Sequence, residues 1–260
     1  MNQQRHWNEF GLVLKRYTSG ERDRQVIVFM RGIGKISVKA RGAKKLTSPF
    51  ISRLSPMNIC QMVLYRTSSG HWTITQCETI HQFTPLQNTT EKNSIGLAIL
   101  DIVDRCTEQN HPNPGLYDIA VETLSLLETT TDNEKITILF HIFQVKVFEM
   151  LGLLPSFSHC TECHQKLDIT LVEKWNPLEI KCDPCLKKDE TVHQKKQHQG
   201  FTKDYLKILN FMKKNPIHQS LKIEINTEAS ENITQILRML WNVQTFSLPK
   251  SLDVLASLHA

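Results

Sequence analysis

The hydrophobic pattern of the chain changes its period once, and this change constrains the fold more than any other feature. Over the first eighty residues, apolar residues alternate in short bursts that are separated by turn signals such as Ser19-Gly20 and Ser68-Ser69-Gly70. The bursts fall at residues 10–14, 26–29, 36–38, 59–64 and 72–75. Five short strands at this spacing, with no helical pattern between the early ones, predict a small antiparallel β-barrel.

From about residue 91 the apolar residues follow a helical period. Ile95, Ile99 and Ile102 mark the apolar face of a first helix. Asn113 followed by Pro114 is typical of the start of a second helix, and the last strong helical pattern spans 233–240. Further helices are expected to begin at Asp132 or Asn133, ending near Gly152 and Pro155, and at Thr202, ending before Pro216. The most apolar stretch, 136–154, carries His141, Gln144, Lys146 and Glu149, which would be costly in hydrocarbon, and this favours a buried helix over a membrane span.

Two Cys-x-x-Cys pairs lie in the helical part, Cys160 with Cys163 and Cys182 with Cys185. Two intervening residues let both sulfurs turn toward one point, and a returning hairpin would bring the second pair opposite the first. Four thiolates fill a tetrahedral shell, so we predict one structural zinc ion in a ribbon at 158–187. The N-terminus shows no secretory pattern, which argues against disulfides. The single cysteines Cys60, Cys77 and Cys106 are expected to be buried and inert.

Positive charge is concentrated in the predicted barrel. Residues 1–80 contain thirteen Lys or Arg and four acids, whereas the remaining 180 residues contain eighteen and twenty-two. Such asymmetry predicts a module that binds a polyanion. The candidate phosphate-binding residues are Arg22 and Arg24 after the first strand, and Lys35, Lys39, Arg41, Lys44, Lys45 and Arg53 in the third strand and the loop beyond it.

Aromatic residues are few in this region. Tyr17, Phe50 and Trp72 are the better candidates for stacking on bases, whereas Phe29 lies in an apolar burst and is expected in the core. With so few platforms, we expect electrostatic attraction to outweigh stacking and sequence preference to be slight.

Several short motifs follow one another in a fixed order. The first strand enters a Gly-Glu-x-Asp turn at 20–23, Gly34-Lys35 precedes the third strand, and the basic run 39–45 is followed by Ser48. Later come Met150-Leu151-Gly152, then Pro155 and the first cysteine pair, and finally the segment 248–251. Together these motifs resemble the bacterial RecO family of DNA repair proteins. The chain has Asn176-Pro177-Leu178-Glu179 where zinc-site members of that family usually carry Gly-Gly.

The resemblance implies an α+β architecture, with a five-stranded OB-fold barrel over residues 1–82 and a helical domain over 83–260 into which the four-cysteine zinc ribbon is inserted. It also implies a non-enzymatic recombination mediator of the RecF pathway, acting in the bacterial cytoplasm at the nucleoid. Such a protein binds single- and double-stranded DNA and anneals complementary strands. With RecR it helps RecA replace single-strand-binding protein, whose C-terminal tail is a further expected partner. No membrane contact is expected.

Two other classes of function remain open from the residues alone. A basic OB barrel with a zinc ribbon suits RNA equally well, so an RNA-binding or ribosome-associated protein is the alternative. A metal-dependent enzyme is disfavoured, because the chain has no Gly-rich phosphate loop, no His-Glu-x-x-His and no Gly-x-Ser-x-Gly. The acids of the helical part are scattered as on a solvated face.

Overall fold

The computed structural model describes residues 6–45, 47–156, 158–166, 180–182, 184–185, 188 and 203–243. The described chain divides into two compact units, one ending at Thr130 and the other beginning at Thr131. Strands give way to helices earlier, since the last strand ends at His81 and the next helix begins at Thr84. The predicted boundary after residue 82 therefore marks the change of secondary structure, whereas the first compact unit also includes three helices that follow the barrel.

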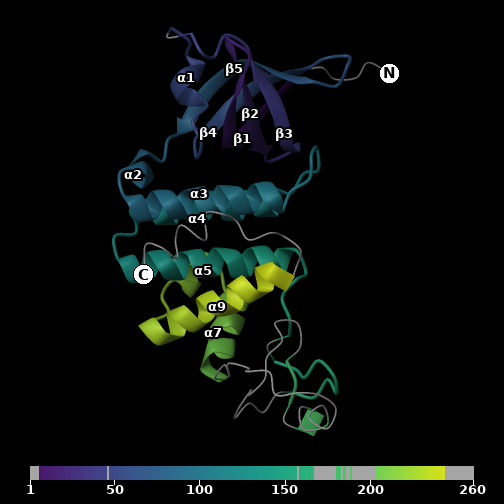
Figure 1. The fold of residues 1–260 in the computed structure, drawn as a ribbon, viewed down its shortest axis with the longest axis vertical. Helices are drawn as coiled ribbons and strands as arrows, with labels where there is room; N and C mark the ends of the chain where they lie inside the picture. Colours follow the sequence, from purple (N-terminus) through teal and green to yellow (C-terminus); the bar gives the residue numbers. More distant parts are fainter. Residues whose placement is uncertain are drawn as a thin grey trace. The chain divides into compact units, whose positions relative to one another are not determined.

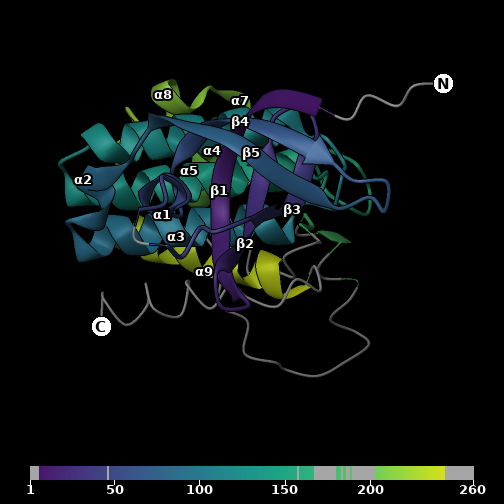
Figure 2. The same cartoon turned by 90° about the horizontal axis from the view of Figure 1, so that it is seen from above.

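A closed five-stranded barrel forms the first part of the chain (Figure 1). Its strands are β1 (His6–Ser19), β2 (Asp23–Met30), β3 (Gly34–Ala40), β4 (Ile59–Arg66) and β5 (Trp72–His81). The order of neighbours is β1-β2-β3-β5-β4, and β4 pairs with β1 to close the sheet. Figure 2 shows the strands from above. Only the β3–β5 pair is parallel among these strands. All five predicted strands are confirmed, and the fold is an OB-fold barrel.

Side-chain alternation explains the barrel core. Val26 and Val28 on β2 and Ile36 and Val38 on β3 are fully buried inside, whereas their neighbours in sequence lie on the outer face. At Gly34 the backbone has φ +89°, and a Cβ would lie 2.1 Å from the backbone oxygen of His111. Only glycine fits this close approach, which brings the loop after α3 against the start of β3.

Four helices belong to the first unit. They are α1 (Phe50–Arg53) between β3 and β4, α2 (Thr84–Gln87), α3 (Thr90–Arg105) and α4 (Pro114–Thr129). The predicted start at Asn113 is confirmed, because its side-chain oxygen accepts a hydrogen bond from the Leu116 amide. The helix α3 runs across one end of the barrel and contacts β1 (Figure 1).

Acids on α3 and α4 are paired with barrel cations. Lys15 lies 3.0 Å from Asp101 and 2.8 Å from Asp104, Lys35 lies 3.0 Å from Asp104, and Arg31 lies 2.8 Å from Asp118. The expectation that the acids lie on a solvated face is therefore wrong for Asp101 and Asp104, which are 17% and 21% exposed, whereas Asp118 is 52% exposed as expected. Helix periodicity in the sequence cannot show it, because the partners lie some seventy or more residues away.

The second unit is a helical bundle of α5 (Asn133–Met150), α7 (Lys203–Lys214), α8 (Ile217–Ser220) and α9 (Thr227–Val243). Asp132 caps α5 through hydrogen bonds from the amides of the next turn, and Gly152 ends it with φ +70°. The predicted helices of this region are confirmed, and α5 is the expected buried helix, although Thr202 lies outside the described residues. Within the described ranges, no helix combines the length and apolarity that crossing a bilayer would need.

Candidate nucleic-acid interface and metal site

Two loops meet at the barrel end that lies away from the α3 and α4 contacts. They are the β1–β2 turn and the loop that joins β3 to α1. The Lys44 amide donates a hydrogen bond to the Arg22 carbonyl oxygen (3.0 Å), and the Lys44 Nζ donates to the Gly20 carbonyl oxygen (2.7 Å). The Gly42 amide donates to Asp23 Oδ1 (2.9 Å). These contacts hold the two loops as one rigid rim.

Six of the predicted phosphate-binding residues gather on this rim and the strand ends below it, and we call this set the basic end: Arg22, Arg24, Lys39, Arg41, Lys44 and Lys45. Arg22, Arg41 and Lys45 are exposed, and no ion pair within the described part of the chain involves them. Lys39 lies 3.1 Å from Asp23. The Gly42 amide and Lys39 lower the pKa of Asp23, so this acid stays ionised and offsets one positive charge of the six.

The other two predicted residues lie elsewhere. Lys35 is only 13% exposed, and its ammonium contacts both the side chain and the carbonyl oxygen of Asp104. Although burial opposes ionisation of Asp104, hydrogen bonds from Lys15 and Lys35 lower its pKa. Lys35 thus joins the barrel to α3 and is not part of the basic end. Arg53, on α1, donates to the Cys77 carbonyl oxygen (2.7 Å) and lies on a different face.

Sequence reasoning missed Arg16, which lies beside the basic end. Its guanidinium donates to the Ile51 carbonyl oxygen (3.0 Å), and burial together with the nearby charge of Arg24 lowers its pKa. The guanidiniums of Arg16 and Arg24 repel each other, so a bound anion would stabilise this part of the surface. Strand pairing places Arg16 opposite Val26, but the β-bulge in β1 between Val13 and Lys15 hides this relation from the sequence.

The aromatic candidates divide clearly between surface and core. Tyr17 is 51% exposed and lies opposite Gln25, which in turn pairs with Lys39, so a row across three strands leads to the basic end. Phe29 is fully buried, as predicted. Trp72 is 6% exposed and packs edge-on against Trp7, so the prediction that it stacks on bases is wrong.

The four predicted metal-binding cysteines lie together, with all sulfur atoms within 4.8 Å of one another. Four thiolates around a tetrahedral ion at about 2.3 Å lie about 3.8 Å apart, and the Sγ atoms of Cys163 and Cys182 are 3.6 Å apart. The donor set therefore fits a metal ion. The intervening ribbon, residues 167–179, lies outside the described part of the chain.

Backbone amides favour the thiolate form at this cluster. Burial disfavours ionisation of Cys160, but amides of Cys163, Cys182 and Glu162 outweigh it and lower the pKa of the Cys160 thiol to about 6. The Cys182 amide lies 3.4 Å from the Cys160 sulfur. Of the single cysteines, Cys60 and Cys77 are buried as predicted, while Cys106 is half-buried and burial raises its pKa to about 12.

The fold and site define an OB-fold protein with a basic barrel end, followed by helices that carry a four-cysteine metal-binding cluster. Comparison with protein families gives a closer assignment. Residues 1–83 match the model described as recombination protein O N terminal, and residues 87–253 match recombination protein O C terminal. The chain belongs to the RecO family of DNA repair proteins.

Individual relatives support this assignment. The chain is similar to the DNA repair protein RecO of Bacillus subtilis, with 32% identity over 69% of this chain and 68% of the relative. It is 28% identical to that of Halalkalibacterium halodurans over the same shares of the two chains. For Acetivibrio thermocellus the identity is 23%, over 86% of this chain and 84% of the relative.

Proposed function

We propose that this chain binds single-stranded DNA at the basic end of its barrel and acts as a non-enzymatic recombination mediator. The backbone of the strand would lie along the rim formed by the β1–β2 turn and the loop after β3, with phosphates contacting the side chains of Arg22, Arg41 and Lys45. Tyr17 offers a face on which a base can stack. Double-stranded DNA would meet the same cations, since phosphates are common to both forms.

One observation carries the proposal, namely the unequal neutralisation of the barrel's positive charge. Lys15, Lys35 and Arg31 are paired with acids of α3 and α4. The cations of the basic end have Asp23 as their only ion-pair partner among the described residues. Clustered cations that the protein does not neutralise attract a polyanion and gain free energy by releasing its counterions.

The mediator role rests on the family. The relatives carry the name DNA repair protein RecO. We infer that the chain anneals complementary strands and, with RecR, helps load RecA onto strands coated by single-strand-binding protein, whose C-terminal tail it contacts. This activity belongs to the RecF pathway and takes place in the cytoplasm at the nucleoid. Strands held by phosphate contacts keep their base edges available for pairing, which is what annealing needs.

We further propose that Cys160, Cys163, Cys182 and Cys185 hold one zinc ion with a structural role. Soft thiolate ligands in a tetrahedral set suit zinc, and four protein ligands leave no position for substrate. The ion would join the two Cys-x-x-Cys turns and so hold them together.

An annealing assay tests the proposed function. Two complementary labelled strands are each coated with single-strand-binding protein and then mixed, and duplex formation is followed with and without the full chain. We expect faster annealing with the chain. Unlabelled single-stranded DNA and RNA are then added as competitors in separate reactions, and DNA should slow annealing more than RNA does. Annealing at the uncatalysed rate would contradict the mediator role, and stronger competition by RNA would favour the RNA-binding alternative.

A further inference from the structure

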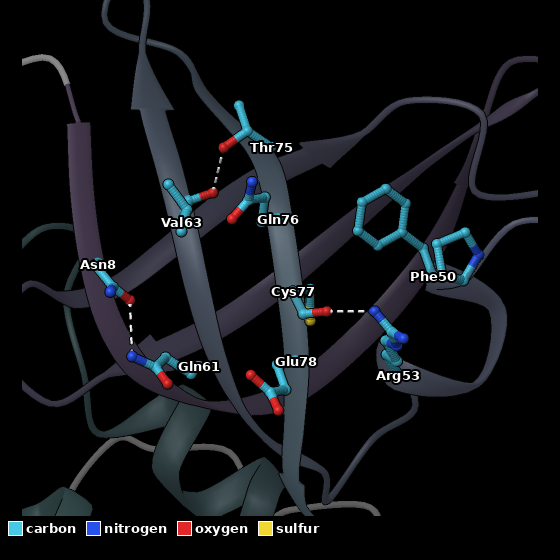
Figure 3. A pocket seen from close by; sticks show the side chains of 10 residues that line it. Asn8, Phe50, Arg53, Gln61, Val63, Thr75, Gln76, Cys77 and Glu78 are labelled. Carbon is cyan, nitrogen blue, oxygen red and sulfur yellow. Dashed lines mark hydrogen bonds between the residues drawn. The ribbon is translucent and has the colours of Figure 1, made fainter.

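A pocket of about 570 Å³ opens on the outer face of β1, β4 and β5, beside α1 (Figure 3). Its volume lies within the roughly 300–1,000 Å³ of small-molecule sites. Strand residues form the floor, and Pro49, Phe50 and Arg53 form one wall. None of these residues belongs to the basic end or to the metal cluster. Pro49 and Phe50 follow the loop of Arg41 and Lys45 in the chain.

The floor is rich in groups that form hydrogen bonds. Asn8, Gln61 and Gln76 present primary amides and Glu78 presents a carboxylate, each from an outward position of its strand. Gln61 Nε2 donates to Asn8 Oδ1 (3.1 Å), and Gln61 lies opposite Glu78 in the β4–β5 register. Three amides and a carboxylate therefore offer donors and acceptors side by side on the sheet.

The aromatic ring of Phe50 borders this polar floor. Phe50 is half-buried and packs against the barrel core, which fixes its ring beside β5. Phe10 does not line the pocket, but it is 43% exposed and lies across from Gln61, which does. Arg53 Nη1 donates to the Cys77 carbonyl oxygen, which orients the guanidinium at the wall. An aromatic ring next to orienting polar groups is an arrangement by which proteins hold an unstacked base.

We propose that this pocket binds the base of a single-stranded nucleotide and prefers bases that carry an exocyclic amino group. A carboxylate accepts a hydrogen bond from such a group, as acids do from cytosine N4, whereas thymine offers no amino group. Glu78 also disfavours a bare phosphate in the pocket, since like charges repel. The inference rests on the proposed single-strand binding and adds a modest sequence preference to it.

The position of the pocket supports continuity with the basic end. The loop that carries Arg41 and Lys45 leads directly into Pro49 and Phe50. A strand whose phosphates lie on that loop would have its next nucleotides at the pocket wall, where Arg53 can meet a phosphate while the base enters. This gives Arg53 a role at the pocket separate from the basic end.

The test compares labelled 20-nucleotide oligomers of deoxycytidine and of thymidine, bound to the full chain at one fixed salt concentration. Wild type should bind the deoxycytidine oligomer roughly fivefold tighter or more, the low end for one good base contact. Glu78→Gln should bring the ratio of the two affinities close to one. This variant also removes a negative charge, which would tighten both complexes alike, so the ratio isolates the base contact. Phe50→Leu should weaken both complexes at unchanged salt dependence, because it removes stacking and no phosphate contact.

Glu122→Gln is the matched control, since it makes the same chemical change at an exposed position of α4. It should keep the wild-type ratio. Equal affinities for the two oligomers in wild type, or a ratio that Glu78→Gln leaves unchanged, would overturn the pocket proposal while the proposed function stands. Failure of wild type to bind either oligomer at low salt would instead refute the proposed function, and the pocket proposal with it.

Discussion

Replacing Arg22, Arg41 and Lys45 with alanine should reduce the salt dependence of single-strand binding by a calculable amount. All three side chains are exposed and lack ion pairs among the described residues, so their removal costs the fold little. Lys44 is kept because its Nζ holds the two loops together through the Gly20 carbonyl oxygen. If each side chain meets one phosphate, the slope of log K against log salt should fall by about 2, at about 0.7 per phosphate on single strands.

The assay is a salt titration with a labelled oligonucleotide. Between 50 and 200 mM salt, wild type should lose about twentyfold more affinity than the triple variant, given that slope difference. The matched control replaces Lys135, Lys214 and Lys222 with alanine, which removes three exposed cations from the second unit. Its slope should equal that of wild type. An unchanged slope in the barrel triple, with normal thermal melting, would refute the placement of the phosphates on these loops.

Three further predictions concern stability. The protein should bind about one zinc ion by elemental analysis, and Cys160→Ser should lose it with local loosening; reduced wild-type protein without zinc would contradict this. Asp104→Ala should destabilise by about 1–3 kcal/mol in denaturant titration, since it leaves two lysines short of a partner, whereas the 85% exposed Glu108 should tolerate alanine within error. Burial lowers the pKa of His141 from 6.5 to about 4, so the unfolded chain binds a proton at this residue before the folded chain does. The free energy of unfolding therefore falls as the pH drops below about 6.5. Wild type should lose about 2 kcal/mol more than His141→Gln between pH 7.5 and 5; equal losses would disprove it.

Much of the fold follows from local patterns in the sequence. The strand bursts, Asn113 before Pro114, Asp132 as a helix cap and Gly152 as a helix stop all act within a few residues of themselves, so each could be predicted. The cysteine cluster follows from spacing alone.

What could not be predicted depends on distant partners. Lys35 and Lys39 are both outward residues of β3, yet one faces an acid on α3 and the other lies at the open end of the barrel. From the sequence, both lysines are equally good candidates for contacting phosphate. Likewise, Trp72 is of a residue type that often stacks on bases, but its pairing with Val38 of the neighbouring strand places it in the core. Burial in a closed barrel depends on register, which charge and composition do not encode.

The route of the DNA strand over the barrel is the central claim, and photo-cross-linking tests it most directly. A single-stranded oligonucleotide with photoreactive bases is cross-linked to the full chain, and the modified peptides are identified by mass spectrometry. Cross-links should concentrate in residues 17–50, at Tyr17 and in the loop that carries Arg41 and Lys45. Cross-links confined to residues 131–243, with the barrel unmodified, would contradict the account.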